Sequence, residues 1–263
     1  IGKFWQRAGR PGFHSEASAA FVDEFKHLFP YDWLDDIRDG VGNHHKPAKK
    51  EIEKIVKIAD RLASRERTEL PGIPQADPDK TPLLATAARI EFREDRPVDW
   101  HRWGYRVDAL SLEEKCVFPT YGVKVDSQDY KRLWVEFESE LKLLQPMKDY
   151  FGLVSLLALL RKYLTFIPSA TPWEKDEEHR TLPDISLYDH LKVTSAIACC
   201  LTRLYPDRLN ALCKGGPLTD QHPVARLLRA DLSGIQRFLY RITRSEPTAE
   251  FRNTAKRLRG RSF

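Results

Sequence analysis

Four histidines and one aspartate in this sequence could bind a divalent metal ion. They are His14, the adjacent pair His44 and His45, Asp60 and His190. Imidazole and carboxylate groups from several helices can share a metal ion, which lowers the pKa of bound water and neutralises charge on a phosphate. Each residue also has an ordinary explanation, because single helical histidines and aspartates are usually hydrogen-bonded core or capping residues. The residue types therefore permit metal-dependent phosphodiester chemistry, but they do not distinguish it from an ordinary structural role.

Amphipathic helices are predicted to position these side chains. Apolar residues recur with the helical period over 15–29, where Ser15 is the predicted N-cap, and more clearly over 48–64, which carries Asp60. The stretch DISLYDHLKVTSAIACCLTRLY predicts a strong helix that carries His190. Further helices are predicted at 127–145 and 149–164. Within 83–125 the short runs ARIEF, YRVDAL and YGVKV are predicted to be strands or strand-like connections. The first 220 residues are therefore expected to be mainly helical.

The composition excludes several classes of protein. Apolar residues make up 41% and charged residues 31% of the 263 residues, so neither a disordered chain nor a membrane protein is expected. The run FGLVSLLALL is too short to span a bilayer and is expected to be a buried helix. Cys199 and Cys200 lie in an apolar helical pattern and are expected to be small core residues. No C-x-x-C pair or signal peptide is present, which favours a cytoplasmic protein without a zinc ribbon.

Two stretches near the C-terminus could bind phosphate. In VARLLRADLSGIQRFLYRI a predicted strand ends at Ser233 and Gly234, and a helix follows. Glycine permits close approach of the backbone, and amides at a helix N-terminus favour phosphate, although the same pattern forms ordinary tight turns. The last stretch, AKRLRGRSF, contains Arg257, Arg259 and Arg261 and no acid. It is either a solvated helix face or a contact with phosphate groups.

Five blocks of sequence, in order, resemble the large subunit of type III CRISPR effector complexes. They are IGKFWQRAG, GNHHKP with IADRLASRER, LLALLRKYLTFIPSAT with PDISLYDHLKVTSAIA, VARLLRADLSGIQRFLYRI, and AKRLRGRSF. YDH-L-K-x-T resembles the type III-A (Csm-type) subunit more than the III-B one. In that family a His-Asp dyad directly precedes I-G-K-F, so the dyad would precede Ile1, and the chain is expected to be part of a longer protein.

The resemblance implies a mainly α fold of two parts. The first is a circularly permuted HD-type helical domain. Residues 1–84 would form its core, without the dyad, and residues 85–222 would complete it with a region that is first mixed and then helical. Residues 223–263 would be the first β-α unit of a ferredoxin-like palm, an α+β domain of the cyclase and polymerase type.

The resemblance also implies roles for individual residues. His190, Asp60 and His14 become candidate ligands of Mn²⁺ or Ni²⁺, and His44, His45 and Lys3 would lie by a single-stranded DNA substrate. The remaining candidates are a nucleotide-binding set, Ser233, Gly234, Gly260 and Ser262, and an RNA- or phosphate-binding set, Arg257, Arg259 and Arg261.

The resemblance finally implies two activities for the longer protein. Its HD domain would cleave single-stranded DNA, and its paired palms would join ATP, with Mg²⁺, into cyclic oligoadenylate. Both would be switched on when target RNA binds the complex of CRISPR RNA and the other subunits. No membrane partner is expected. Neither activity is expected of this chain alone, since the dyad and the Gly-Gly-Asp-Asp motif of the second palm do not occur in it. The alternatives are a nuclease-inactive scaffold subunit, and a stand-alone HD nucleotide phosphohydrolase, which the LSGIQ and RLRGRSF blocks disfavour.

Overall fold

The structure is a computed structural model that describes residues 1–67, 69, 74–90, 99–173, 180–215 and 225. The chain divides into two compact units, Ile1–Ala225 and Arg226–Phe263. The predicted first β-α unit of a palm, at residues 223–263, therefore lies almost wholly outside the described residues, and that part of the fold stays a prediction.

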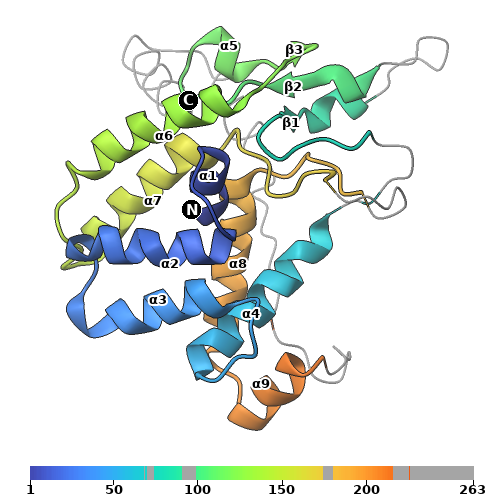
Figure 1. Cartoon of the computed structure of the whole chain (residues 1–263). Helices are drawn as coiled ribbons and strands as arrows, with labels where there is room; N and C mark the ends of the chain where they lie inside the picture. The colour runs from blue at the N-terminus through green and yellow to red at the C-terminus, as the bar shows by residue number, and fades with distance from the viewer. Residues whose placement is uncertain (68, 70–73, 91–98, 174–179, 216–224, 226–263) are drawn as a thin grey trace, which may run out of the picture. The chain divides into compact units, whose positions relative to one another are not determined.

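The described residues of the first unit are mainly helical, as the sequence predicts (Figure 1). The α-helices are α1 (Gly2–Arg7), α2 (His14–Glu24), α3 (Leu34–Asn43), α4 (Glu51–Ala63), α5 (Glu114–Val117), α6 (Ser127–Leu141), α7 (Tyr150–Leu164), α8 (Leu187–Leu201) and α9 (Pro206–Cys213). Short 3-10 turns join several of them: η1 (Lys26–Leu28), η2 (Tyr31–Trp33), η3 (Ser64–Glu66), η4 (Thr86–Arg89) and η5 (Trp100–Arg102). None of the described helices is both long and apolar enough to cross a bilayer.

A small antiparallel sheet lies within residues 83–125, but its strands share only Tyr105 with the predicted run YRVDAL and only Tyr121 with YGVKV. Its order is β1-β2-β3, formed by Leu83–Leu84, Trp103–Tyr105 and Thr120–Tyr121. Leu83 pairs with Tyr105, and Gly104 pairs with Thr120. A side chain at Gly104 would press on the Leu83 carbonyl, 2.9 Å away, so glycine permits this close pairing. The predicted strand-like run ARIEF instead begins inside η4.

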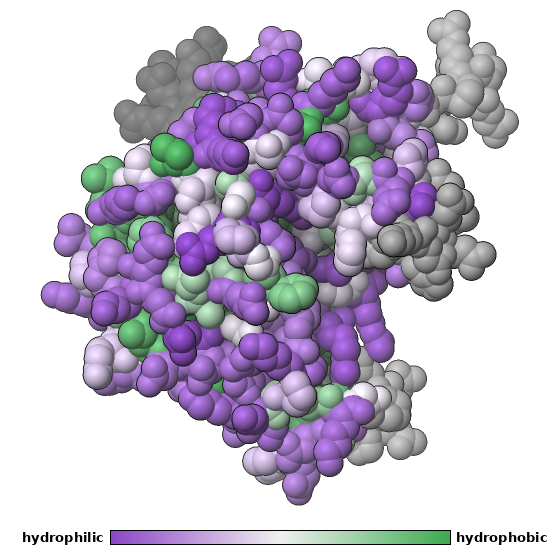
Figure 2. Space-filling model, in the orientation of Figure 1, coloured by the Kyte–Doolittle hydropathy of each residue, from purple (hydrophilic) through white to green (hydrophobic). Residues whose placement is uncertain are grey.

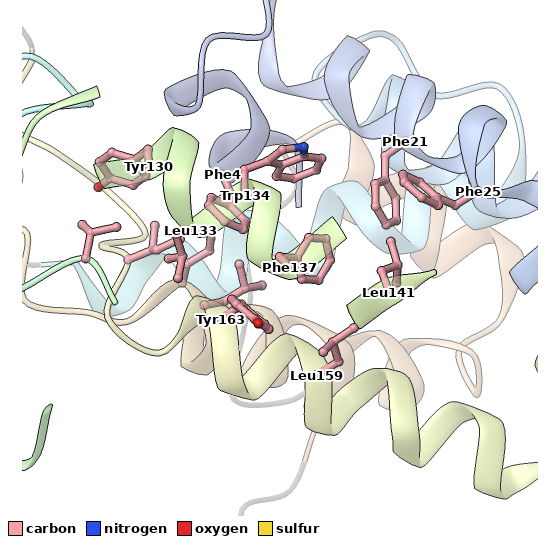
Figure 3. Packing of buried hydrophobic residues seen from close by; sticks show 14 of the residues in the cluster. Phe4, Phe21, Phe25, Tyr130, Leu133, Trp134, Phe137, Leu141, Leu159 and Tyr163 are labelled. Atoms are coloured by element: carbon pink, nitrogen blue, oxygen red, sulfur yellow. The ribbon is translucent and has the colours of Figure 1, made fainter. Parts of the chain in front are cut away.

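Helix α6 supplies the centre of the main hydrophobic core. Its residues Tyr130, Leu133, Trp134, Phe137 and Leu141 follow the helical period and are all buried. They meet aromatic residues from α1 and α2 and apolar residues from α7, as Figure 3 shows. The Asp126 carboxylate starts this helix by accepting hydrogen bonds from the backbone amides of residues 128 and 129, at 2.8 and 3.2 Å.

A second core holds α4 between α8 and α9. Ile55, Ile58 and Ala59 of α4 are buried against Leu201 of α8 and two leucines of α9. The helix predicted at 48–64 is therefore confirmed as α4, with its apolar face turned to these neighbours. Asp60, next to Ala59, lies at the edge of the α4–α8 interface.

Two expectations about buried residues are wrong. Cys199 and Cys200 of α8 are exposed, and in α7 the run FGLVSLLALL is only partly buried, with Phe151 76% exposed. The apolar pattern identified these helices. However, α7 carries apolar residues on every side, and the described residues cover only one side of it. In the view of Figure 2 the surface is mainly hydrophilic, with hydrophobic residues in separate small groups.

The predicted N-cap at Ser15 is also wrong. Helix α2 begins one residue earlier, at His14, and Phe13 is its N-cap residue. The Glu16 carboxylate accepts a hydrogen bond from the Phe13 backbone amide at 3.2 Å. This bond satisfies the amide of the N-cap residue itself, as the glutamate of a capping box does. His14 is consequently the first residue of the helix, and Ser15 is buried within it.

Candidate metal centre

Three histidines from two segments meet at the ends of α2 and α3. His14 opens α2, while His44 and His45 directly follow α3. One potential ligand atom from each lies within 4.8 Å of the other two. The Nε2 atoms of His14 and His45 are 2.8 Å apart. Three imidazoles this close offer the nitrogen donor set that Mn²⁺, Ni²⁺ and zinc all accept.

His44 has a defined tautomer. Its Nδ1 lies 2.7 Å from the carbonyl oxygen of Val41, which can only accept a hydrogen bond, so Nδ1 carries the proton. In the neutral ring Nε2 then keeps its lone pair. A backbone carbonyl that fixes a histidine in this way is the usual outer support of a metal-binding imidazole.

A glycine in α1 sets the position of His14. The backbone amide of Gly2 donates to Ser18 Oγ at 3.2 Å, and Ser18 Oγ donates to the His14 carbonyl at 2.9 Å. A Cβ atom at Gly2 would overlap the His14 carbonyl oxygen. Glycine therefore lets α1 lie directly on the first turn of α2, where His14 stands.

Glu53 holds the loop that carries His44 and His45. It is 4% exposed, and its carboxylate accepts hydrogen bonds from Asn43 Nδ2 at 2.8 Å and from the Lys50 backbone amide at 2.9 Å. The Lys49 backbone amide donates to the same carboxylate. The backbone donors of Lys50 and then Lys49 are the main causes that lower the pKa of Glu53. The Glu53 carboxylate thus holds the two ends of the loop together.

Asp60 and His190 form a pair between α4 and α8. The His190 Nε2 to Asp60 Oδ1 distance is 3.1 Å, and these residues are 130 positions apart in the chain. His190 is almost fully buried, with 1% exposed, while the Asp60 side chain is 30% exposed. Burial raises the pKa of Asp60, but the hydrogen bond from His190 and the nearby positive charges outweigh it, so the pKa falls below its ordinary value. Asp60 is therefore a carboxylate at neutral pH.

The cap of α8 places His190. Ser186 Oγ accepts hydrogen bonds from the amides of Tyr188 and Asp189 at 3.2 and 3.5 Å. The His190 amide donates to the Ser186 carbonyl at 3.0 Å in the first helical turn. This start of the helix turns His190 toward α4 and Asp60.

The histidines of the cluster are neutral at pH 7. Burial, followed by the charge of Lys3, lowers the pKa of His14 to about 3. Burial is also the largest cause that lowers the pKa of His44 and of His45. Asp60 acts in the opposite direction on all three, which places its charge beside the cluster. Neutral imidazoles with free lone pairs are the form that binds a metal ion.

Lys3 adds a positive charge next to these ligands. Its Nζ donates to the Ser169 carbonyl at 2.7 Å. Burial, then the charges of Arg67 and Arg7, lower the pKa of Lys3 to about 8. Lys3 remains mostly protonated at neutral pH, and Arg67 stands close enough to interact with it. Such cations beside a metal site can bind the oxygens of a phosphodiester.

The structure brings together every candidate that it describes. His14, His44 and His45 form one cluster, and the Asp60–His190 pair and Lys3 lie beside it. The nucleotide and phosphate candidates lie outside the described residues: Ser233, Gly234, Gly260, Ser262, Arg257, Arg259 and Arg261. Sequence reasoning missed Glu53 and Arg67. Glu53 could have been found as a glutamate in the first turn of the helix predicted at 48–64.

Comparison with known sequences gives related proteins along the whole chain. The chain is 30% identical, over 298 residues, to the CRISPR system single-strand-specific deoxyribonuclease Cas10/Csm1 (subtype III-A) of Methanocaldococcus jannaschii, covering 100% of this chain and 35% of that protein. It is 34% identical over 215 residues to the protein of the same name from Thermococcus onnurineus, with 79% and 22% covered. The chain therefore spans about a third or less of its relatives' length. No protein-family model matches it.

Comparison with solved structures gives the same fold. The crystal structure of Csm1 from T. onnurineus matches with a TM-score of 0.51 and 27% identity, over 77% of this chain and 27% of that one. A chain in the crystal structure of a Csm1–Csm4 cassette in complex with pppApA matches with a TM-score of 0.52 and 24% identity, over 80% of this chain and 27% of that one. This likeness concerns the fold alone.

Proposed function

Because the chain belongs to the Cas10/Csm1 family of subtype III-A CRISPR systems, we propose that its histidine cluster is part of a metal-dependent site that cleaves single-stranded DNA. One observation carries the proposal. Three neutral imidazoles from two segments converge within 4.8 Å, beside a carboxylate and a half-buried lysine. Core histidines that only fill space would not need to gather so closely that the ring nitrogens of two of them are hydrogen-bonded.

The described residues fit a Mn²⁺ or Ni²⁺ ion. His14, His44 and His45 would hold it, and Asp60, kept ionised by His190, would add a carboxylate beside them. A bound ion would lower the pKa of a coordinated water and neutralise charge on the phosphodiester. Val41 fixes the ring of His44, and Lys3 would position a phosphate of the DNA.

The full-length protein would have a second activity in a different domain. We propose that residues 1–222 form the permuted HD domain, that a ferredoxin-like palm begins near residue 223, and that paired palms join ATP into cyclic oligoadenylate with Mg²⁺. Target RNA, CRISPR RNA and the other subunits of the cytoplasmic complex would control both activities. Family membership supports this proposal, and the residues that would carry it lie outside the described part of the chain.

The nuclease proposal is tested by His14→Ala and His44→Ala in the full-length protein, assembled with its complex and activated by target RNA. Loss of one ligand should reduce Mn²⁺-dependent cleavage of single-stranded DNA by about a hundredfold or more. His27→Ala is the matched control, because His27 is an exposed histidine in η1, away from the cluster. If the His14 and His44 variants cut as fast as the control, the cluster is not the nuclease site. If the unaltered protein neither binds Mn²⁺ by calorimetry nor cuts DNA, the scaffold alternative replaces the proposal.

A further inference from the structure

Helices α3 and α4 pack against each other in the lower part of Figure 1. Between them lies a groove of about 410 Å³ that is open to solvent, which we call the α3–α4 groove. The residues that line it are apolar apart from one aspartate: Trp33, Asp36, Ile37, Gly40, Val41, Ile52 and Val56. A volume of this size falls in the range of pockets that bind ligands. The groove can therefore take up apolar side chains of a partner.

A glycine leaves room in the α3–α4 groove. At Gly40 the helix α3 has no side chain, and an added Cβ atom would meet only carbons of Ile52 and Val56, each at 3.5 Å. The lining positions 33, 37, 40 and 41 are three or four residues apart, so they lie on one side of α3. They extend over about 12 Å of helix, which matches about two turns of a second helix lying alongside.

Two exposed aromatic side chains lie at the start of the groove. Trp33 is 64% exposed although it lines the groove, and Tyr31 nearby is 89% exposed. Tryptophan and tyrosine contribute much of the binding energy in protein interfaces, because each buries a large and rigid area on contact. Such side chains beside an apolar groove therefore indicate a surface that binds another polypeptide.

The side of the groove that α3 forms is acidic. Residues 31–43 contain four acids and one base: Asp32, Asp35, Asp36, Asp39 and Arg38. The base pairs with an aspartate of α2, and Lys50 pairs with Asp39 and lies 3.8 Å from Asp36. Asp32 and Asp35 are exposed and form no ion pair with any residue that the structure describes. Two carboxylates at this side of the groove are therefore open to a cationic partner.

The α4 side of the groove does not balance this charge. Lys54 lies two positions from both Ile52 and Val56, so it points to another side of the helix. Lys57 turns back to the chain before α4, where its Nζ donates to the Lys46 carbonyl at 2.8 Å. An occupant with positive charges beside its apolar side chains would complement the groove.

We propose that the α3–α4 groove binds a basic amphipathic helix of another protein. A helix laid in a groove presents apolar side chains at i, i+3, i+4 and i+7. These would fill the space over Gly40 and contact Trp33, while lysines or arginines next to them would pair with Asp32 and Asp35. The proposal depends neither on the nuclease site nor on family membership.

A designed peptide tests the proposal in the full-length protein. The probe is a fluorescent helix of about 18 residues, with leucines at i, i+3, i+4 and i+7 and lysines elsewhere. The matched peptide keeps the leucines and has glutamate in place of every lysine. Fluorescence anisotropy at about 0.15 M salt should show one-to-one binding of the lysine peptide, at least tenfold tighter than the glutamate peptide. No binding, or equal binding of both peptides, would overturn the proposal.

Gly40→Leu should fill the groove and weaken binding of the lysine peptide at least tenfold. Gly40→Ala is the matched control, because one methyl group reaches Ile52 and Val56 only at an ordinary contact distance and leaves most of the groove open. Thermal unfolding shows whether the leucine variant still folds. A folded Gly40→Leu protein that binds the peptide as tightly as the Gly40→Ala protein would contradict the proposal.

A second comparison tests the charges at exposed positions, where folding is not at risk. Asp32→Lys combined with Asp35→Lys should weaken the lysine peptide at least tenfold and strengthen the glutamate peptide. Glu114→Lys combined with Asp207→Lys makes the same change in net charge at exposed positions of α5 and α9. Equal losses in the two double variants would mean that net charge alone attracts the peptide, which would overturn the proposal.

The labelling rate at position 33 identifies other occupants of the groove. In the full-length protein, the thiol of a Trp33→Cys variant should react with a maleimide at a rate close to that of the urea-unfolded protein, and the lysine peptide should slow it. Slow labelling without peptide at every protein concentration would mean that the protein's own polypeptide covers the groove. Labelling that slows as the protein concentration rises would indicate a second copy. Either result would overturn the proposal.

Discussion

At the scale of single residues, Glu53 shows how the site is supported from outside its ligands. Its hydrogen bonds do not go to the three histidines but come from residues at both ends of their loop. A buried carboxylate with several such donors is strongly favoured in its charged form. The position of His44 and His45 thus depends on the charge of a residue eight or nine positions further along the chain.

Replacing Glu53 with glutamine should destabilise the protein and loosen the histidine loop. Glutamine keeps the size but loses the charge, and one of its two terminal groups can only donate. We expect the free energy of unfolding in urea to fall by about 1–2 kcal/mol at pH 7. Mn²⁺ affinity should fall by about tenfold, the lower end for loss of an outer support. Glu51→Gln, at an exposed position in the same helical turn, should change neither.

The same variant should show a defined pH dependence. The folded-state pKa of Glu53 is lowered, so its contribution is complete above the unfolded-state pKa and is lost as the pH falls through the folded value. The difference in stability between the unaltered protein and Glu53→Gln should therefore be constant from pH 7 to about 5 and shrink below about 4. Urea titrations at several pH values measure it. A difference that grows on acidification would contradict the assigned role.

Asp60 tests the link between α4 and α8. Replacing it with asparagine removes the charge that faces the buried His190. We expect a loss of about 1–3 kcal/mol in the free energy of unfolding, since the hydrogen bond involves a charged group and one partner is buried. Asp35→Asn, which changes an exposed acid of α3, should have little effect. Equal stability of the two variants would mean that the pair contributes nothing to the α4–α8 contact.

At the scale of elements, two buried glycines in helices should respond oppositely to alanine. A methyl group at Gly2 would overlap the His14 carbonyl, so α1 and α2 must separate, and Gly2→Ala should cost about 1–3 kcal/mol of stability. Gly40 in α3 has only Ile52 and Val56 carbons at 3.5 Å, an ordinary contact. Gly40→Ala should be neutral or stabilise the protein by up to about 1 kcal/mol, because alanine favours a helix. Thermal unfolding of both variants, with Mn²⁺ binding as a second measurement, checks the contrast.

The elements also show what could be predicted from sequence. Helix α4 was predictable because its apolar residues follow a single period, and α8 was predictable for the same reason. The start of α2 was not, since the N-cap residue is Phe13 and its amide donates to the Glu16 carboxylate rather than a serine hydroxyl capping the helix. The exposure of α7 was not either, because a helix that is apolar on every side contains no signal for which side the rest of the chain covers.

The candidate site was predictable only in part. Its residues were identified because a family pattern marked them, not because their spacing required a site. Asp60 and His190 meet across 130 residues, and no local rule links them. The grouping of His14 with His44 and His45 depends on how α1 packs on α2 and how Glu53 closes the loop, both of which are tertiary contacts.

At the scale of the whole molecule, one side of α7 is buried in the main core and the other side is exposed. The contribution of this helix to stability therefore depends on how much polypeptide surrounds it. Leu157 points outward and is 45% exposed, while Leu159 is 7% exposed in the main core. In the 263-residue chain Leu157→Ser should change the free energy of unfolding by less than about 0.5 kcal/mol, as for other exposed positions. Leu159→Ala in the same chain should cost about 2–4 kcal/mol through lost burial and the cavity that remains.

In the full-length protein the two substitutions should become similar. If further polypeptide covers the outer side of α7 there, Leu157→Ser removes a buried apolar contact and should cost about 1–3 kcal/mol. Parallel urea unfolding of the short and long proteins, each with both variants, gives the comparison. Because Leu159 is buried in both the short and the long protein, the Leu159→Ala variant measures any general difference in stability between the two proteins. A Leu157 variant as neutral in the long protein as in the short one would mean that the outer side of α7 meets water in both, and that its apolar residues need another explanation.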